Sequence, residues 1–179
     1  MLFKSIVASL FSLSLAGSTF ALPVAIQAGG ALQRRAFPLQ AYADFQISDT
    51  PAGNAQAEAE AVFVKPFEGI DLATVSDEDR DNVEAMRSLA EKAETEQFNP
   101  AIDAASGEEA DALQRGKIKN KVLKLTGISQ VRKIDLAKAQ AAGKSTASIE
   151  TKLADSQKKL AKNIATDKAS AGLDAKGVV

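Results

Sequence analysis

The chain has 179 residues, with 22 basic and 23 acidic side chains, and it contains no cysteine, histidine or tryptophan. These absences exclude a thiol nucleophile, a Ser-His-Asp triad and a zinc site built from thiolate or imidazole ligands. They also exclude disulfides, which small exported proteins often need for stability. We therefore expect a protein that is stabilised by packing alone and that uses no cofactor and no metal.

Residues 1–21 have the pattern of a secretory signal peptide. Lys4 precedes an apolar run, and small residues, Thr19 and Ala21, stand at the third-last and last positions before the predicted cleavage point. The apolar run is too short to span a bilayer, which needs roughly 20 apolar residues. We expect a secreted, extracellular protein with no stable membrane insertion.

A second processing site is predicted at the basic pair formed by Arg34 and Arg35. The residues between the two cuts, 22–35, carry no folding signal of their own. We expect them to form a propeptide that a secretory-pathway protease removes after Arg35; an unstructured N-terminal arm is the alternative. The mature chain would consist of a single helical domain at residues 36–168 and a flexible tail at residues 169–179.

Charge is distributed unevenly along the mature chain. Residues 36–111 contain 18 acidic and 4 basic side chains, whereas residues 112–179 contain 5 acidic and 15 basic ones. One interpretation is that acidic and basic helices lie antiparallel and neutralise each other. The other is that the basic half offers a docking face to an acidic partner.

Hydrophobic spacing and capping residues predict the elements of the first half. Residues 39–47 alternate between apolar and polar side chains, which predicts an extended segment lying across helices. Thr50 and Pro51 predict a helix start, and the helix should end near residue 63 at a turn. Ser76 should cap the next helix, whose acidic first turn suits the positive end of the helix dipole. Capping is favoured there over a calcium loop, because the central glycine of such a loop is missing.

Prolines and glycines divide the second half into short predicted helices. The Asn-Pro pair at residues 99–100 predicts a break near Phe98, and Gly107 predicts another interruption. Apolar stripes then predict one helix that ends at Gly127, a second that ends at Gly143, and a last helix capped by residue 145 or 146. The expected fold class is all-α: a compact bundle of five or six short helices with an extended N-terminal strap.

One dense basic patch is the candidate binding site of the chain. On a helix its lysines would interleave with apolar residues, which is typical of a solvated amphipathic surface helix. The functional alternatives are contact with a host protein that has an acidic surface, an import-like signal for entry into a host cell or its nucleus, or contact with anionic lipid. Nucleic acid is not expected, because no aromatic residue is interleaved to stack on a base. The patch consists of Arg115, Lys117, Lys119, Lys121 and Lys124.

Three segments resemble a known group of proteins. Residues 41–49 (AYADFQISD), 52–55 (AGNA) and 111–125 (DALQRGKIKNKVLKL) are similar to small secreted proteins of filamentous ascomycete fungi, and the resemblance spans residues 42–164. It implies an exported, cysteine-free helical protein of a kind often regarded as a candidate effector acting on a plant host. It carries no catalytic residue over to this chain.

The function expected first is a secreted, non-enzymatic protein-interaction module, a fungal virulence effector that binds a host protein through the basic patch. The alternative is an extracellular helical carrier of a small apolar ligand, because pockets between bundle helices suit that role and the aromatic residues gather in the first half of the mature chain. A hydrolase that uses paired carboxylates is least favoured. With 18 acidic residues in the first half of the mature chain, some pair will always lie at the separation that the reaction requires, so the presence of such a pair is not specific evidence.

Overall fold

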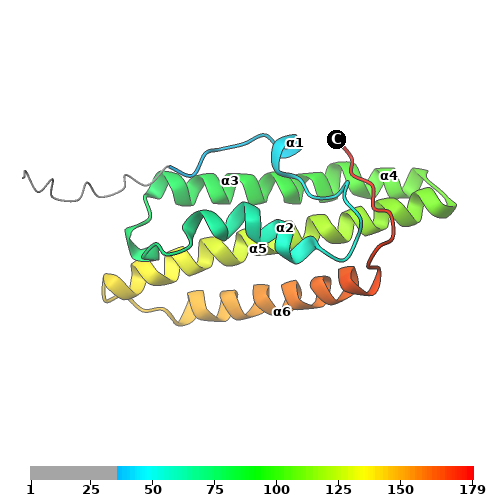
Figure 1. Cartoon of the computed structure of the whole chain (residues 1–179). Coiled ribbons are helices and arrows are strands. Elements are labelled where there is room, and N and C mark those ends of the chain that lie inside the picture. Colours follow the sequence, from blue (N-terminus) through cyan, green and yellow to red (C-terminus); the bar gives the residue numbers. More distant parts are fainter. Residues whose placement is uncertain (1–35) are drawn as a thin grey trace, which may run out of the picture. The chain divides into compact units, whose positions relative to one another are not determined.

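The computed structural model describes residues 36–179, which form an all-α domain without strands (Figure 1). The predicted signal peptide ending at Ala21, the predicted propeptide and the basic pair Arg34–Arg35 lie outside the described residues. The elements in chain order are α1 (Tyr42–Phe45), α2 (Ala55–Phe63), η1 (Lys65–Phe67), η2 (Leu72–Thr74), α3 (Asp77–Ala93), η3 (Glu94–Phe98), α4 (Asn99–Ala104), α5 (Gly107–Ala141) and α6 (Ala147–Ala169).

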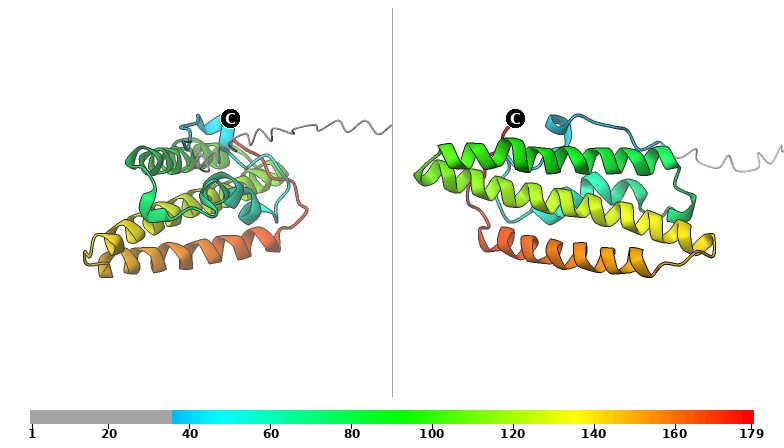
Figure 2. Two further views of the ribbon diagram at one scale, coloured as in Figure 1. Left: turned by 60° about the vertical axis from the view of Figure 1, so that its left-hand side comes forward. Right: turned by 180° about the vertical axis from the view of Figure 1, so that it is seen from behind.

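The long helix α5 lies in the middle of the domain. α3 and α6 run antiparallel to α5 on either side of it, and α2 packs on one face of this layer (Figures 1 and 2). The expected compact helical bundle is thus confirmed. The two 3₁₀ turns, η1 and η2, connect α2 to α3, and the π-helical segment η3 joins α3 to α4.

The hydrophobic core lies where α2, α3 and α5 meet. It combines aromatic side chains from the first half with aliphatic ones from α5, and burying each contributes about 1.5–3 kcal/mol relative to exposure. The predicted inward face of α3 is confirmed, and so is its cap, since Ser76 Oγ accepts the N–H of Asp79 at 3.1 Å. The largest core residues are Phe37, Phe45, Phe63, Phe67, Val83, Met86, Val122, Leu123, Val131 and Ile134.

The alternating pattern of residues 39–47 does not produce one extended segment with a buried face. The single-turn helix α1 interrupts it, and only Phe45 and Ile47 of the predicted face are buried, while Leu39 is 58% exposed. A lone strand has no neighbour to accept its backbone hydrogen bonds. Here the N–H of Gln46 instead donates to the carbonyl of Tyr42 within the turn, at 3.0 Å.

Helix α2 ends at Phe63 as predicted, but its predicted start at Thr50 and Pro51 is wrong. It begins at Ala55, whose N–H donates to Asp167 Oδ2 at 3.0 Å. Asp167 belongs to α6, so a carboxylate far along the chain satisfies one of the unpaired N–H groups at the first turn of α2. Local sequence carries no signal for such a cap.

The predicted break near Phe98 is also wrong. The chain remains helical from α3 through η3 into α4, and Asn99 itself has helical dihedral angles (φ −57°, ψ −55°). Pro100 lacks an N–H and its ring crowds the preceding turn, so a regular α-helical ladder cannot continue across it. The wider π-helical turn accommodates the proline without ending the helix.

Helix α5 is a single helix of 35 residues, although Gly127 was predicted to end it. A Cβ atom at Gly127 would lie 2.7 Å from Arg87 Cβ on α3 and 3.1 Å from the ring of Phe63 on α2. The glycine therefore permits three helices to approach closely, and does not break one. The turn predicted at Gly143 is confirmed, because α5 ends just before it.

The C-terminal tail is docked on the domain, in contrast to the flexible tail expected. Gly172 donates its N–H to the carbonyl of Ala52, and the carbonyl of Leu173 accepts the N–H of Ala52, both at 2.9 Å. Further on, the N–H of Lys176 donates to the carbonyl of Ala112 at 3.0 Å. The tail thereby connects the end of α6 to both the N-terminal segment and α5.

We predict that Gly127→Ala destabilises the protein by about 1–3 kcal/mol through overpacking against α2 and α3. The direction of the stability change is diagnostic, because replacing glycine with alanine at an uncrowded helix position stabilises the helix by up to about 1 kcal/mol. Urea denaturation followed by far-ultraviolet circular dichroism measures the change. A variant more stable than the wild type would contradict the close helix approach.

Candidate functional site

The predicted basic patch does not form an open cationic surface. Its central residue, Lys119, is 0% exposed, and its ammonium donates to the carbonyls of Thr50 and Pro51 at 3.0 and 3.1 Å and to Thr50 Oγ1 at 2.5 Å. It also lies 2.7 Å from a carboxylate oxygen of Glu58 on α2. Buried lysines are rare unless paired in this way, so Lys119 holds the N-terminal segment and α2 against α5.

Most of the remaining patch is paired as well. Lys124 and Lys121 flank the carboxylate of Glu94 at 2.6 and 3.5 Å, and Arg115 donates from Nε to the carbonyl of Asp174 at 2.5 Å. Only Lys117 has no polar partner within residues 36–179, and it is half-buried. The structure therefore does not present the five residues as one binding face.

Ion pairs between the two halves of the chain neutralise much of the charge asymmetry. Arg80 near the start of α3 binds Asp135 near the end of α5 at 2.9 Å, and Asp77 lies 2.5 Å from Lys138. The hydrogen bond and charge of Lys138 lower the pKa of the exposed Asp77 carboxyl. This antiparallel pairing confirms the first of the two interpretations of the charge distribution.

A group of exposed lysines lies instead on α6. Lys158, Lys159 and Lys162 are exposed, and their ammonium groups make no hydrogen bond or ion pair to any other described residue. The sequence pattern predicted the basic face at residues 115–124, where lysines are densest, and did not identify the exposed lysines of α6. Lys162 lies three residues after Lys159 and four after Lys158, and this spacing, which places side chains on one helix face, could have identified them.

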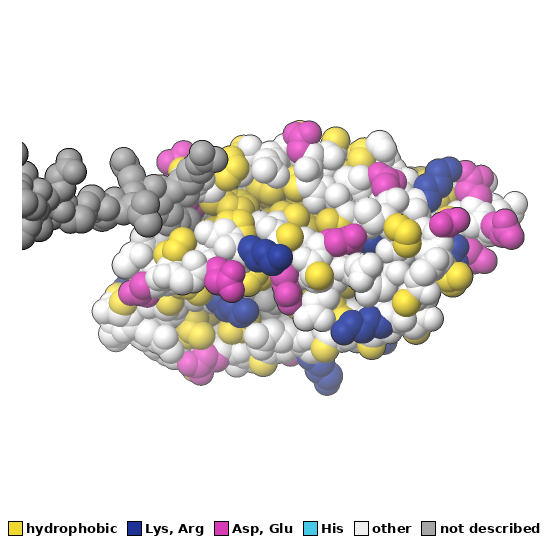
Figure 3. Space-filling model, in the orientation of Figure 1, with side chains coloured by type: hydrophobic (Ala, Val, Ile, Leu, Met, Phe, Trp, Pro, Cys, Tyr) yellow, Lys and Arg dark blue, Asp and Glu magenta, His cyan; other side chains and the backbone are white. Residues whose placement is uncertain are grey.

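An apolar groove opens on the surface of the domain. It has a volume of about 530 Å³ and lies between the N-terminal segment, α2 and α3. Apolar side chains gather along this region of the surface in the space-filling view (Figure 3). The groove is lined by Ala36, Phe37, Pro38, Gln40, Asp44, Phe45, Ala61, Val62, Pro66 and Met86.

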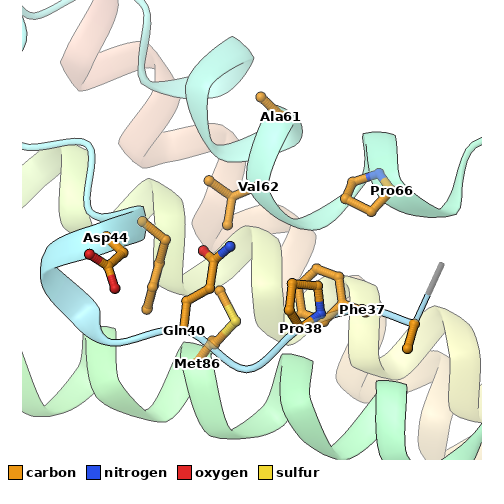
Figure 4. Close-up of a pocket in the computed structure, with 10 residues that line it drawn as sticks. Phe37, Pro38, Gln40, Asp44, Ala61, Val62, Pro66 and Met86 are labelled. Atoms are coloured by element: carbon orange, nitrogen blue, oxygen red, sulfur yellow. The ribbon is translucent and has the colours of Figure 1, made fainter.

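The polar groups of the groove are few and unpaired. The side chains of Asp44 and Gln40 make no hydrogen bond or ion pair to other residues in the described range, and no lining residue is basic. Asp44 stands on α1 at one end of the groove, and Phe37 lies below Pro66 at the other (Figure 4). An apolar trough with a carboxylate at one end has the character of a small-molecule site.

The walls of the groove are held firmly in place. The ring of Phe37 lies 5.3 Å from that of Phe67, and the ring of Phe45 lies 6.0 Å from that of Phe63, edge to face. Such aromatic pairs contribute about 0.5–1.5 kcal/mol beyond their buried area. Two aromatic residues, Phe37 and Phe45, thus line the groove, and Phe63 and Phe67 pack against them.

A buried polar network supports the wall behind Phe45. Tyr42, whose ring lies 5.6 Å from that of Phe45, donates its hydroxyl to Asn120 Oδ1 at 2.9 Å. Asn120 in turn donates to the carbonyl of Ala90 at 2.8 Å. Burial favours the neutral phenol and raises the pKa of Tyr42 to about 12. The network ties α1 to both α3 and α5.

Within residues 36–179 no cluster of three or more acidic side chains is arranged to hold a metal ion. None of the described helices combines the length and the apolar character needed to cross a bilayer.

A family model described as a domain of unknown function (DUF8454) matches residues 37–179. No curated protein matches the chain, and no solved structure does. The match begins at Phe37, the first buried residue of the described domain. The resemblance to secreted fungal proteins stays a prediction from the sequence.

We predict that Lys119→Met lowers the free energy of unfolding by about 3 kcal/mol, because it leaves the carbonyls of Thr50 and Pro51 without this donor and the carboxylate of Glu58 without its partner. Lys117→Met is the matched control on the same helix and should change stability by less than about 0.5 kcal/mol. Urea denaturation of both variants measures the difference. Equal effects would show that Lys119 is an ordinary surface lysine.

We predict a delayed titration of Tyr42, the single tyrosine of the chain. In the folded protein its phenol should ionise near pH 12, and in the urea-unfolded chain near 10.0. Because the folded state holds the proton more tightly, this group's contribution to stability is complete below pH 10.0 and is lost as the pH rises towards about 12. Tyrosinate absorbance measures both midpoints, and a native midpoint near the unfolded one would disprove burial of the phenol.

Proposed function

The chain belongs to the DUF8454 family, whose description assigns no activity, and we propose that it is an exported, non-enzymatic binding protein that holds a small apolar ligand in the groove between its N-terminal segment, α2 and α3. The observation that carries this proposal is the groove itself, which combines an apolar lining with an unpaired carboxylate. Export rests on the signal-peptide pattern of residues 1–21.

The dimensions of the groove suit a small ligand. Ligand pockets commonly enclose about 300–1,000 Å³ and are lined mainly by apolar and aromatic side chains with a few polar groups that fix orientation. The groove has about 530 Å³ and presents Phe37, Phe45, Val62 and Met86 to its interior. These side chains are already packed against the core, so binding would require little ordering of the protein.

The charge at the groove indicates the kind of ligand. Asp44 supplies a carboxylate and Gln40 an amide, and neither is engaged by another described residue. An apolar molecule with an amine or another hydrogen-bond donor at one end would satisfy both groups. A molecule that ends in a carboxylate would meet repulsion from Asp44 and no compensating cation.

We predict that the protein binds decylamine more tightly than decanol, and decanol more tightly than decanoate, when each displaces the neutral dye Nile red. Ala61→Trp fills the groove from the exposed side of α2 and should weaken all binding by about tenfold or more, which corresponds to about 1.4 kcal/mol. Asp44→Asn should remove the preference for the amine over the alcohol, a difference of a few fold at an exposed position.

Ala154→Trp is the matched control, because Ala154 is equally exposed but lies on α6, away from the groove. This variant should bind as the wild type does. Absence of binding by all three probes, or equal weakening by both tryptophan substitutions, would refute the groove as a ligand site.

Binding of a host protein, the function expected first from the sequence, has less support from the geometry. Four of the five residues in the basic patch are engaged within the domain, and charge reversal at Lys119 would disrupt folding and so could not report on binding. A face with unpaired positive charge is formed by Lys158, Lys159 and Lys162 on α6. An effector role through a host partner therefore stays a hypothesis whose contact residues belong on α6.

A further inference from the structure

A second groove, of about 450 Å³, is formed by α3, α5 and the first turns of α6. The three helices lie side by side when the domain is seen from behind (Figure 2). None of the residues that line this groove belongs to α2 or to the N-terminal segment, and none of them lines the first groove. The two grooves are therefore separate sites, and the second is lined by both charged and apolar side chains.

The acidic side chains of the second groove are all bound by arginines of α3. Asp135 of α5 accepts hydrogen bonds from Nε and Nη2 of Arg80 at 3.0 and 2.9 Å. Glu91 accepts from Nη1 of Arg87 at 2.7 Å, and Glu84 binds the same guanidinium. Charge-assisted pairs of this kind are among the stronger hydrogen bonds in proteins. No carboxylate that lines this groove is therefore left without a cation.

The basic side chains on the α6 side of the groove are not balanced in this way. Arg132 of α5 donates from Nη1 to the backbone carbonyl of Lys152, which carries no charge. A guanidinium has several further N–H donors, and those of Arg132 have no polar partner among residues 36–179. The ammonium of Lys152 is exposed and also has no partner in this part of the chain. Two cations thus face this end of the groove without a carboxylate.

Apolar side chains lie beside these two cations. Ile128 and Val131 come from α5, and Ile149 stands about one turn before Lys152 on α6. Val131 is buried, whereas Ile128 and Ile149 are partly exposed to the groove. Small-molecule sites commonly have volumes of about 300–1,000 Å³ and combine an apolar lining with a few polar groups that fix orientation. The second groove has both properties.

We propose that the second groove binds a small organic molecule that carries a carboxylate on an apolar body. The carboxylate accepts hydrogen bonds from Arg132, whose planar fork matches two carboxylate oxygens, and lies near the ammonium of Lys152. The apolar body packs on Ile128 and Ile149. It is the carboxylate that is held at the α6 side, because on α3 a single guanidinium is shared by two carboxylates and leaves that wall with excess negative charge.

The preferred charge is opposite to that expected for the first groove, where an unpaired carboxylate selects against an acidic ligand. The second site therefore does not depend on the function proposed for the first. Either groove can fail as a ligand site without affecting the other.

The test compares 2-naphthoate with its neutral analogue 2-naphthylmethanol by isothermal titration calorimetry on the full chain at low salt. We expect naphthoate to bind about fivefold more tightly than the alcohol, and Arg132→Gln to remove this preference. Lys133→Gln is the matched control, because it removes the same charge from the neighbouring residue, which does not line the groove. This variant should keep the affinity of the wild type.

Lys152→Glu is a second variant, chosen because the exposed ammonium makes no contact whose loss could unfold the protein. The new carboxylate should repel naphthoate and weaken its binding by about fivefold or more. Lys144→Glu makes the same change at an exposed lysine outside the groove and should have little effect. Circular dichroism checks that each variant is folded.

Three results would overturn the proposal: no binding of naphthoate by the wild type, equal affinity for naphthoate and the alcohol, or equal losses in Arg132→Gln and Lys133→Gln. Ala61→Trp, which fills the first groove, separates the two sites. It should leave naphthoate binding unchanged. Loss of naphthoate binding in Ala61→Trp but not in Arg132→Gln would place the carboxylate in the first groove and would also overturn the proposal.

Discussion

Every major element of the domain depends on packing against α5. Helices α2, α3 and α6 all contact it, and the C-terminal tail crosses it. Without disulfides, this one helix must provide both apolar and polar attachment for the rest of the chain. It does so with Val122, Leu123 and Ile134 in the core and with the ammonium of Lys119 beneath the N-terminal segment.

The buried lysine explains how an irregular segment is held against the domain. Residues between α1 and α2 have no helical or sheet hydrogen bonds of their own to fix them. Lys119 binds two of their carbonyls, and the Tyr42–Asn120 hydrogen bond holds α1 nearby. The groove wall formed by residues 36–45 is held by other contacts, those of Phe37 with α3 and of Tyr42 with Asn120 on α5.

Ion pairs within the domain change what the uneven charge distribution implies about function. A dense run of lysines next to a strongly acidic N-terminal half first indicates an electrostatic docking face. In the folded chain most of these charges act within the domain, between α3 and α5 or between α2 and α5. The features discussed for binding an outside molecule are therefore the apolar groove with a single carboxylate at its end, the second groove between α3, α5 and α6, and the exposed lysines on α6.

The sequence by itself determined the helical class, the inward face and Ser76 cap of α3, the end of α2 and the turn at Gly143, because each of these depends on residues within a turn or two of one another. It also contains the two linear patterns from which processing is predicted. Only the tertiary structure decided that Gly127 is a contact point, that Asp167 caps α2, that the tail docks and that Lys119 is buried. The physical reason is that each of these outcomes depends on groups far apart in the sequence that packing brings within a few ångströms of one another. The spacing of residues along the chain does not determine which groups meet in this way.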